Sequence, residues 1–368
     1  MSPRPPVREP LRWAVELDGA GRHPAAWRLP GARPGELFTA AHWRRLAATV
    51  EAADLDLLVV PDAYRLQSAE EGDQRGRLDA VALAAHLAPL TRRAGLVPVV
   101  TTTHTEPFHT QKAIATLDLT SRGRAGWQVE VSTTSVEADL FGRKPSAPAE
   151  ELWREAAETV DVARRLWDSW EDDAVIRDVA TGRYVDRDRL HPVEFAGEFF
   201  SVKGPSITPR SPQGQPLVVV PVREEPSLAL AAAQADVARL ETADPDRAGT
   251  WAAALPDATV LLDVEVLLRR EAGEAADVAA QLEEWSPGHA PRTLRHVGTP
   301  ETFLDLLGDL PAGVGGVAVV PLDLPVTLDL LAADVVPRVA RPVVRGSTLR
   351  ERFGLPRPAS RYARGVPA

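Results

Sequence analysis

The sequence contains no cysteine among its 368 residues. This absence excludes disulfide bonds, thiolate-ligated metal sites and cysteine nucleophiles. The sequence also has no apolar run of about 18 residues, the length that a membrane-spanning helix needs. Its amino-terminal segment is basic and rich in proline but has no apolar core, unlike a secretory signal. We therefore expect a cytoplasmic protein without a membrane span.

A basic surface and several catalytic motifs are missing as well. The formal net charge is −10 and the isoelectric point is near 5.4, which argues against nucleic acid as the main partner because phosphate binding needs a basic face. The sequence has no Walker A motif and no G-x-S-x-G nucleophile motif, and no G-x-G-x-x-G follows the first expected strand. The histidines are scattered without the spacing of metal ligands, so we expect no metal site.

What the sequence does contain is an alternation of apolar, strand-like segments with helical ones. About eight such pairs predict a (β/α)8 barrel, with a doubly wound open sheet as the alternative. The 33 prolines indicate long ordered loops between the elements. We expect strands at 12–17, 56–60, 96–100, 125–131, 216–220, 236–240, 259–264 and 316–321. We expect helices at 39–52, 78–91, 109–121, 150–170, 226–234, 246–255, 273–285 and 324–340.

Polar residues follow two of the expected strands at their carboxyl ends, where both kinds of α/β fold bind their ligands. An aspartate after the second strand is either a ligand contact or acid–base group, or the start of a turn. Three threonines and a histidine after the third strand suit hydrogen bonding to a planar polar ligand, with ordinary β-branched strand content as the alternative. These residues are Asp62, Thr101, Thr102, Thr103 and His104.

Two irregular segments interrupt the alternation. The loop at 19–36 contains Trp27 and Arg28. This pair suits an anionic substrate, although burial of the tryptophan alone would also explain it. The segment 171–215 has the pattern of an insertion with a β-hairpin, one strand being 198–202. We expect this insertion to cover the site as a lid.

The missing motifs and the polar strand ends together indicate a barrel enzyme that depends on an organic cofactor. A barrel without metal ligands, cysteine or a serine motif often takes its reactivity from such a group. The protein then supplies binding, orientation and electrostatics.

Six segments spread over the chain match the pattern of one enzyme family. They are GRHPAAWRLPG (21–31), DLDLLVVPD (54–62), TTTHTEPFHTQKAIATLDLTSRGRAGWQ (101–128), LWDSWEDDAV (166–175), GPSITPRSPQGQPLVVV (204–220) and STLRERFGLPRPASRY (347–362). In this order they resemble the flavin-dependent monooxygenases of the bacterial luciferase-like superfamily, in particular the branch of nitrilotriacetate monooxygenase and dibenzothiophene-sulfone monooxygenase. The resemblance implies a single luciferase-like TIM barrel over 1–368, with the insertion 171–215 and a carboxy-terminal tail at 341–368.

The resemblance also implies an activity, a cofactor and partners. Members of this superfamily are FMNH2-dependent two-component monooxygenases, in which a separate flavin reductase supplies reduced FMN and O2 oxygenates a small organic substrate. A homodimer is expected on the same grounds. By position, the residues that match the family's flavin site are Asp62 at the flavin edge, Thr101 to Thr103 beside the isoalloxazine ring, and Trp127 with Gln128 in place of a Gly-Trp-Asn turn.

The sequence departs from the family where flavin phosphate should bind. Ala149 and Trp153 occupy the positions of a histidine and a tyrosine at the head of the long helix. The turn 221–227 reads Pro-Val-Arg-Glu-Glu-Pro-Ser and lacks the glycine and small hydroxyls that allow close approach to phosphate. Trp153 and Arg223 remain as cofactor-binding candidates there, while Glu224 opposes an anion. The alternative is therefore a non-catalytic or flavin-free homologue that serves as a partner subunit.

Overall fold

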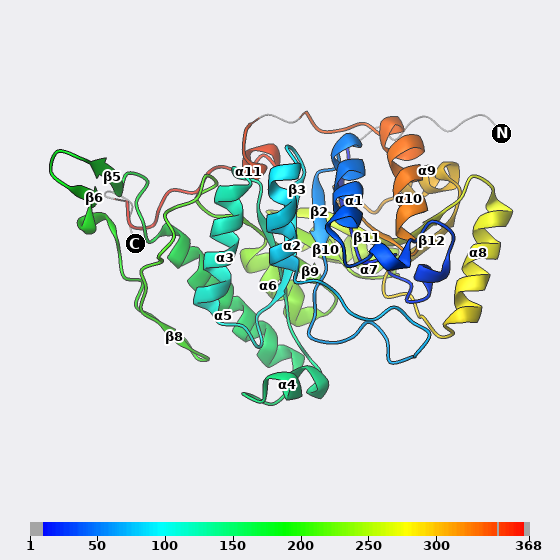
Figure 1. Cartoon of the computed structure of the whole chain (residues 1–368), viewed down its shortest axis with the longest axis horizontal. Coiled ribbons are helices and arrows are strands. Elements are labelled where there is room, and N and C mark those ends of the chain that lie inside the picture. Colours follow the sequence, from blue (N-terminus) through cyan, green and yellow to red (C-terminus); the bar gives the residue numbers. More distant parts are fainter. Residues whose placement is uncertain (1–9, 344–345, 364–368) are drawn as a thin grey trace.

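Eight parallel strands close into a barrel that is covered on its outside by helices (Figure 1). The computed structural model describes residues 10–343 and 346–363. Neighbouring strands pair in the order β1-β2-β3-β4-β9-β10-β11-β13, and β13 returns to pair with β1. The predicted (β/α)8 barrel is confirmed, and the open sheet is wrong because this sheet closes on itself. The barrel strands are β1 (Arg12–Glu16), β2 (Leu57–Val60), β3 (Gly95–Thr101), β4 (Gly126–Glu130), β9 (Leu217–Val222), β10 (Val237–Leu240), β11 (Thr259–Leu268) and β13 (Gly316–Pro321).

Most helices lie where the alternation predicted them, with ends that differ by a few residues. The largest difference concerns the expected helix 324–340, which leaves α-helical geometry after Leu330. A π-helical turn and a 3-10 turn follow, the latter containing Pro337, which has no N–H to continue a helix. None of the described helices is long and apolar enough to cross a membrane. The predicted helices are α1 (Ala40–Ala52), α2 (Ala80–Leu87), α3 (Pro107–Thr120), α5 (Ala149–Asp168), α6 (Glu225–Gln234), α7 (Pro245–Ala253), α8 (Ala272–Trp285) and α10 (Leu324–Leu330).

Four further elements were not predicted from the sequence. The strand β12 pairs only with the second half of β11 and is mostly half-buried, so its residues lack the apolar character of the barrel strands. The helix α9 does carry a start signal, because Thr299 caps it and Pro300 follows. The four elements are α4 (Ser135–Phe141), β12 (Leu294–Gly298), α9 (Pro300–Gly308) and α11 (Leu349–Arg352).

The insertion 171–215 lies beside α5, at the far left of Figure 1, and away from the barrel axis. It forms two small antiparallel hairpins, so the expected strand 198–202 is shorter than predicted. The carboxy-terminal segment runs against it, with Arg357 paired to Asp172 and the Tyr362 ring stacked on His191. The hairpin strands are β5 (Val175–Asp178), β6 (Arg183–Val185), β7 (Phe195–Ala196) and β8 (Ser201–Val202).

The barrel interior changes from apolar to charged along its strands. Aliphatic side chains fill the first layers, and Leu349 and Phe353 at the end of the chain close this apolar core. Because inward-facing residues recur at every second position of a strand, the next inward positions can be read from the sequence. They are Glu16 two residues after Ala14, Arg239 two residues after Val237, and Asp263 two residues after Leu261, and all three are buried.

One buried guanidinium organises the charged layer. Arg239 is 1% exposed and donates to Glu16 at 3.0 Å, to Gln128 at 2.7 Å and to both oxygens of Asp263 at 3.0 and 2.7 Å. Two carboxylates thus share one cation. Burial raises the pKa of Asp263 to about 7 against the opposing charge of Arg239. Although burial acts in the same direction on Glu16, the charges of Arg22 and Arg239 lower the pKa of that carboxyl.

Close strand packing makes Gly316 a sensitive position. A Cβ atom there would lie 2.2 Å from the carbonyl oxygen of Arg12, its partner across the β1–β13 ladder. We expect Gly316→Ala to lower the free energy of unfolding by about 1–3 kcal/mol, measured by urea denaturation. The control is Gly315→Ala, whose Cβ would meet nothing closer than 3.7 Å. Equal denaturation midpoints for the two variants would contradict this account of the packing.

The shared cation predicts a dependence of stability on pH. Because the pKa of Asp263 is higher in the folded chain than in the unfolded chain, the folded state binds the extra proton. The stabilisation that this proton gives to the folded state is complete below about pH 4 and is lost as the pH rises through about 7. Relative to Asp263→Asn, the wild type should lose stability over this range, by up to about 1.4 kcal/mol per pH unit. Urea denaturation at several pH values tests this, with exposed Asp257→Asn as the control; parallel pH profiles for wild type and Asp263→Asn would refute it.

Candidate functional site at the barrel mouth

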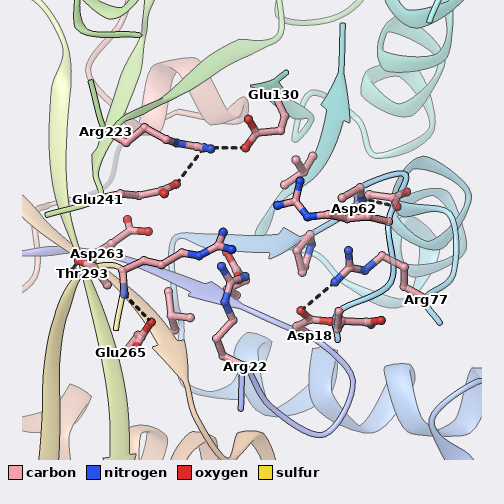
Figure 2. A pocket seen from close by; sticks show the side chains of 18 of the residues that line it. Asp18, Arg22, Asp62, Arg77, Glu130, Arg223, Glu241, Asp263, Glu265 and Thr293 are labelled. Carbon is pink, nitrogen blue, oxygen red and sulfur yellow. Dashed lines mark hydrogen bonds and ion pairs between the residues drawn. The ribbon is translucent and has the colours of Figure 1, made fainter. Parts of the chain in front are cut away.

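A cavity of about 490 Å³ opens at the carboxyl ends of the barrel strands (Figure 2). This is the rim where the sequence predicted ligand-binding groups, and where TIM-barrel enzymes place their active sites. Side chains from every barrel strand or the loop that follows it reach the wall, and most of them are polar or charged. Those at the strand ends include Glu16, Asp62, Thr101, Gln128, Glu130, Arg223, Glu241, Asp263 and Glu265.

Most of the charges in this wall are paired with one another. Such pairs fix the side chains and cancel much of the field, because each guanidinium lies against a carboxylate. Burial raises the pKa of Asp18 even though the charges of Arg77 and Arg22 oppose it. The pairs in the loops around the mouth are Arg22–Glu16 at 3.1 Å, Arg77–Asp18 at 3.4 Å and Arg65–Glu137 at 3.3 Å.

Asp62 lines the cavity and also holds the backbone around it. One carboxylate oxygen accepts from the N–H of Ala63 at 2.8 Å, and the other accepts from the N–H of Ala80, the first residue of α2, at 3.0 Å. Burial raises the pKa of Asp62 against these two hydrogen bonds. The carboxylate therefore fixes the turn, as one interpretation held, and it also lines the cavity, where its role as a ligand contact or acid–base group stays a prediction.

Of the three threonines, only Thr101 lines the cavity. Its hydroxyl lies 3.0 Å from that of Ser132, Thr103 accepts from the Ser132 N–H at 2.9 Å, and Thr102 donates to a backbone carbonyl at 3.2 Å. These hydroxyls join the end of β3 to the end of β4. His104 lies outside the cavity wall, stacked on Phe141 at 4.9 Å between ring centroids.

Of the remaining residues predicted to contact the flavin ring or the substrate, some line the cavity and others do not. Gln128 points into the barrel and lines the cavity, whereas its neighbour Trp127 points outward and is buried in the core under the helices. Trp27 and Arg28 both donate to the carbonyl of Gly72, at 3.0 and 2.7 Å. They hold two loops together and do not line the cavity.

The turn before α6, where the resemblance implies that flavin phosphate binds, has already used two of its backbone donors. The Ser227 hydroxyl accepts from the N–H of Arg223 at 3.1 Å and from the N–H of Glu224 at 3.2 Å. Pro226, at the start of the helix, has no N–H to offer. An anion at a helix amino terminus is held by such N–H groups, so the turn has fewer of them to offer.

The side chains of the same turn oppose an anion as well. Glu224 brings a carboxylate, which accepts from the indole N–H of Trp153 at 2.9 Å. Arg223 bridges Glu130 at 2.7 Å and Glu241 at 3.2 Å, as Figure 2 shows. Despite its burial, these carboxylates keep the pKa of Arg223 above its usual value. The residues of this turn therefore do not fit the phosphate of FMN.

The sequence reasoning missed the charged interior of the barrel. Glu16, Arg239 and Asp263 were taken as parts of apolar strands, and the pairing of the loop arginines was not considered. A signal was present, because a single charge at an inward position of an otherwise apolar strand requires a buried partner. Which charge meets which was decided by the closure of the barrel. Among the described residues, no group of three or more histidine or carboxylate side chains is placed to hold a metal ion.

Comparison with known proteins agrees with this architecture. Residues 22–296 match the family described as Luciferase-like monooxygenase. N-acetyl-S-(2-succino)cysteine monooxygenase of Bacillus subtilis (strain 168) is 29% identical over 437 residues, which covers 97% of this chain and 99% of that protein. One of the subunits of pristinamycin IIA synthase from Streptomyces pristinaespiralis is 32% identical over 320 residues, which covers 87% of this chain and 90% of that protein.

The fold is shared with a solved structure of lower sequence identity. The crystal structure of long-chain alkane monooxygenase superposes with a TM-score of 0.85 at 22% identity, covering 94% of this chain and 96% of that one. The family match at residues 22–296 covers six of the eight barrel strands, β2 to β4 and β9 to β11. The chain therefore belongs to the luciferase-like monooxygenase family.

Proposed function

We propose that this chain is a partner subunit of an FMNH2-dependent two-component monooxygenase, whose flavin is held by a second luciferase-like chain. In such a system a separate flavin reductase supplies FMNH2, and one oxygen atom of O2 enters a small organic substrate. Family membership and the barrel architecture support the assignment to this reaction class. The similarity to a protein named as one of the subunits of a synthase supports the role of a partner chain.

The observation that carries the proposal is the state of the turn before α6. The N–H groups of Arg223 and Glu224 are bound to Ser227, and the one cation of the turn, Arg223, is neutralised by Glu130 and Glu241. The Glu224 carboxylate adds a negative charge where the phosphate would lie. A phosphate would have to break these contacts and accept a like charge beside it, which opposes binding in a partly dehydrated site.

A second candidate is that this chain holds FMNH2 itself and oxygenates the substrate. It is favoured by the ring-side positions that keep the family pattern and line the cavity, namely Asp62, Thr101 and Gln128. When bound, reduced flavin would supply the reactivity toward O2. This chain's residues would accept hydrogen bonds from the ring, as Asp62 can, and limit the access of water. The phosphate would then need a different position from that used in the family.

Titration with reduced FMN under anaerobic conditions separates the two candidates. For the partner-chain role we expect no saturable binding in the micromolar range, followed by flavin absorbance and equilibrium dialysis of the purified full-length chain. Saturable micromolar binding would overturn the partner-subunit proposal and support the second candidate.

If flavin does bind, Asp62 is expected to contribute to it. Asp62→Ala should then weaken the binding of reduced FMN at least tenfold, because the ring loses a charged acceptor at its edge. The matched control is Asp79→Ala, which removes a cap from the same helix α2 by a residue outside the cavity. Equal affinities for the two variants would show that Asp62 serves only the backbone.

A further inference from the structure

Three arginines reach the cavity from separate loops: Arg22 after β1, Arg65 after β2, and Arg292 between α8 and β12. Figure 2 shows Arg22 extending toward the middle of the cavity. None of the three belongs to the turn before α6. They are distant in sequence, so only the closed barrel brings them together.

These arginines have more hydrogen-bond donors than the surrounding protein uses. A guanidinium carries five N–H donors. Arg22 uses one nitrogen on Glu16, and Arg65 uses one nitrogen on Glu137. Among the residues that the structure describes, the guanidinium of Arg292 has no hydrogen-bond or ion-pair partner, although its backbone N–H donates to Glu265 at 3.3 Å. Several donors therefore remain directed at the cavity.

The three positive charges also act on one another. Partial desolvation lowers the pKa of Arg292, although its side chain is exposed, and the charges of Arg22 and Arg65 act in the same direction. Glu241 opposes this effect but is already bound to Arg223. Like charges that lie near one another repel, and an anion bound between them relieves the repulsion.

A neutral histidine lies beside the cluster. Burial and the charges of neighbouring arginines lower the pKa of His289 to about 4, so its ring is neutral at pH 7. The buried Nε2 atom of His289 has no hydrogen-bond partner in the described part of the chain. The His23 ring packs against it at 4.7 Å between centroids, and the Nε2 of His23 is also unpartnered there. Buried polar atoms are normally satisfied, and His289 lines the cavity, so its Nε2 is available to a ligand there.

We propose that Arg22, Arg65 and Arg292 form an oxyanion site that binds the carboxylate or phosphate group of a small organic ligand in the barrel mouth. Planar guanidinium groups match both oxyanions with paired hydrogen bonds. The cavity, at about 490 Å³, has room for more than an inorganic ion. Thr101 and Gln128 on its wall offer neutral polar contacts to the rest of the ligand. The site does not depend on which chain holds the flavin.

Calorimetry on the full-length chain at low salt tests the site with propane-1,2,3-tricarboxylate, its neutral triamide and inorganic phosphate. We expect the tricarboxylate or phosphate to bind and the neutral triamide not to bind. The affinity for the anion should fall as salt is added. Arg292→Gln should weaken anion binding at least tenfold, since it removes the one guanidinium of this cluster that has no partner among the described residues. Because that side chain supports no contact there, the variant should keep the wild-type melting temperature. The control is Arg44→Gln on the exposed face of α1, which should leave binding unchanged.

A second pair of titrations identifies the source of the anion. Reduced FMN and reduced riboflavin differ only by the phosphate. If FMN binds more tightly and Arg292→Gln removes the difference, the site holds flavin phosphate, and the partner-subunit proposal fails while the oxyanion site stands. If the tricarboxylate binds and neither flavin does, the site takes an organic acid and both proposals stand. If no anion binds, or if Arg292→Gln binds each as well as the wild type does, the oxyanion site is refuted.

Discussion

The buried guanidinium of Arg239 is the interaction on which the barrel mouth depends. It lies at the level where the apolar interior ends, and it holds Glu16, Gln128 and Asp263 from three different strands. Removing one partner from a buried ion pair typically costs about 3–5 kcal/mol, because the other charge is left uncompensated. With Arg239 in place, carboxylates can line the inside of the barrel. Of the loop arginines, Arg22 finds its partner among them, at Glu16.

The same pairing of charges extends to the turn before α6. Ser227 accepts from the N–H groups of Arg223 and Glu224, two carboxylates bind the Arg223 side chain, and Glu224 accepts from Trp153. The side chains of this turn therefore have partners within the chain. Within the described residues, the positive charge of the cavity that remains without a partner lies instead in another loop, at Arg292. The family fold is therefore present together with a cavity whose unpaired charge lies outside this turn.

Much of the fold could be predicted from the alternation of strand and helix patterns. Barrel strands such as 316–321 were found because they are apolar and bounded by turns, and buried parallel strands require that pattern. The strand β12 was missed because it pairs only with part of β11 and needs no apolar face. The end of α10 was missed because the apolar pattern continues past Leu330. The backbone there changes to a π-helical turn and then to a 3-10 turn.

The candidate site could be predicted only in part. Asp62, Thr101, Gln128 and Arg223 line the cavity, because the carboxyl end of a barrel strand always faces this rim. Trp127 and Thr102 do not, since the period of two in a strand turns every second side chain outward. The insertion 171–215 contributes no residue to the cavity wall, because it packs on α5 and the carboxy-terminal segment. Sequence spacing carries no information about such packing.

The sequence by itself determined the class of fold, the rim at which the candidate site lies and, through the resemblance of its segments, the family. The fold and the rim follow from local patterns, since hydrophobic periodicity and turn residues act within a few positions of the chain. Only the tertiary structure decided which charges meet. Arg22, Arg65 and Arg292, like Arg239 and its carboxylates, come together because the barrel closes, and their hydrogen bonding depends on distances between strands that are far apart in sequence.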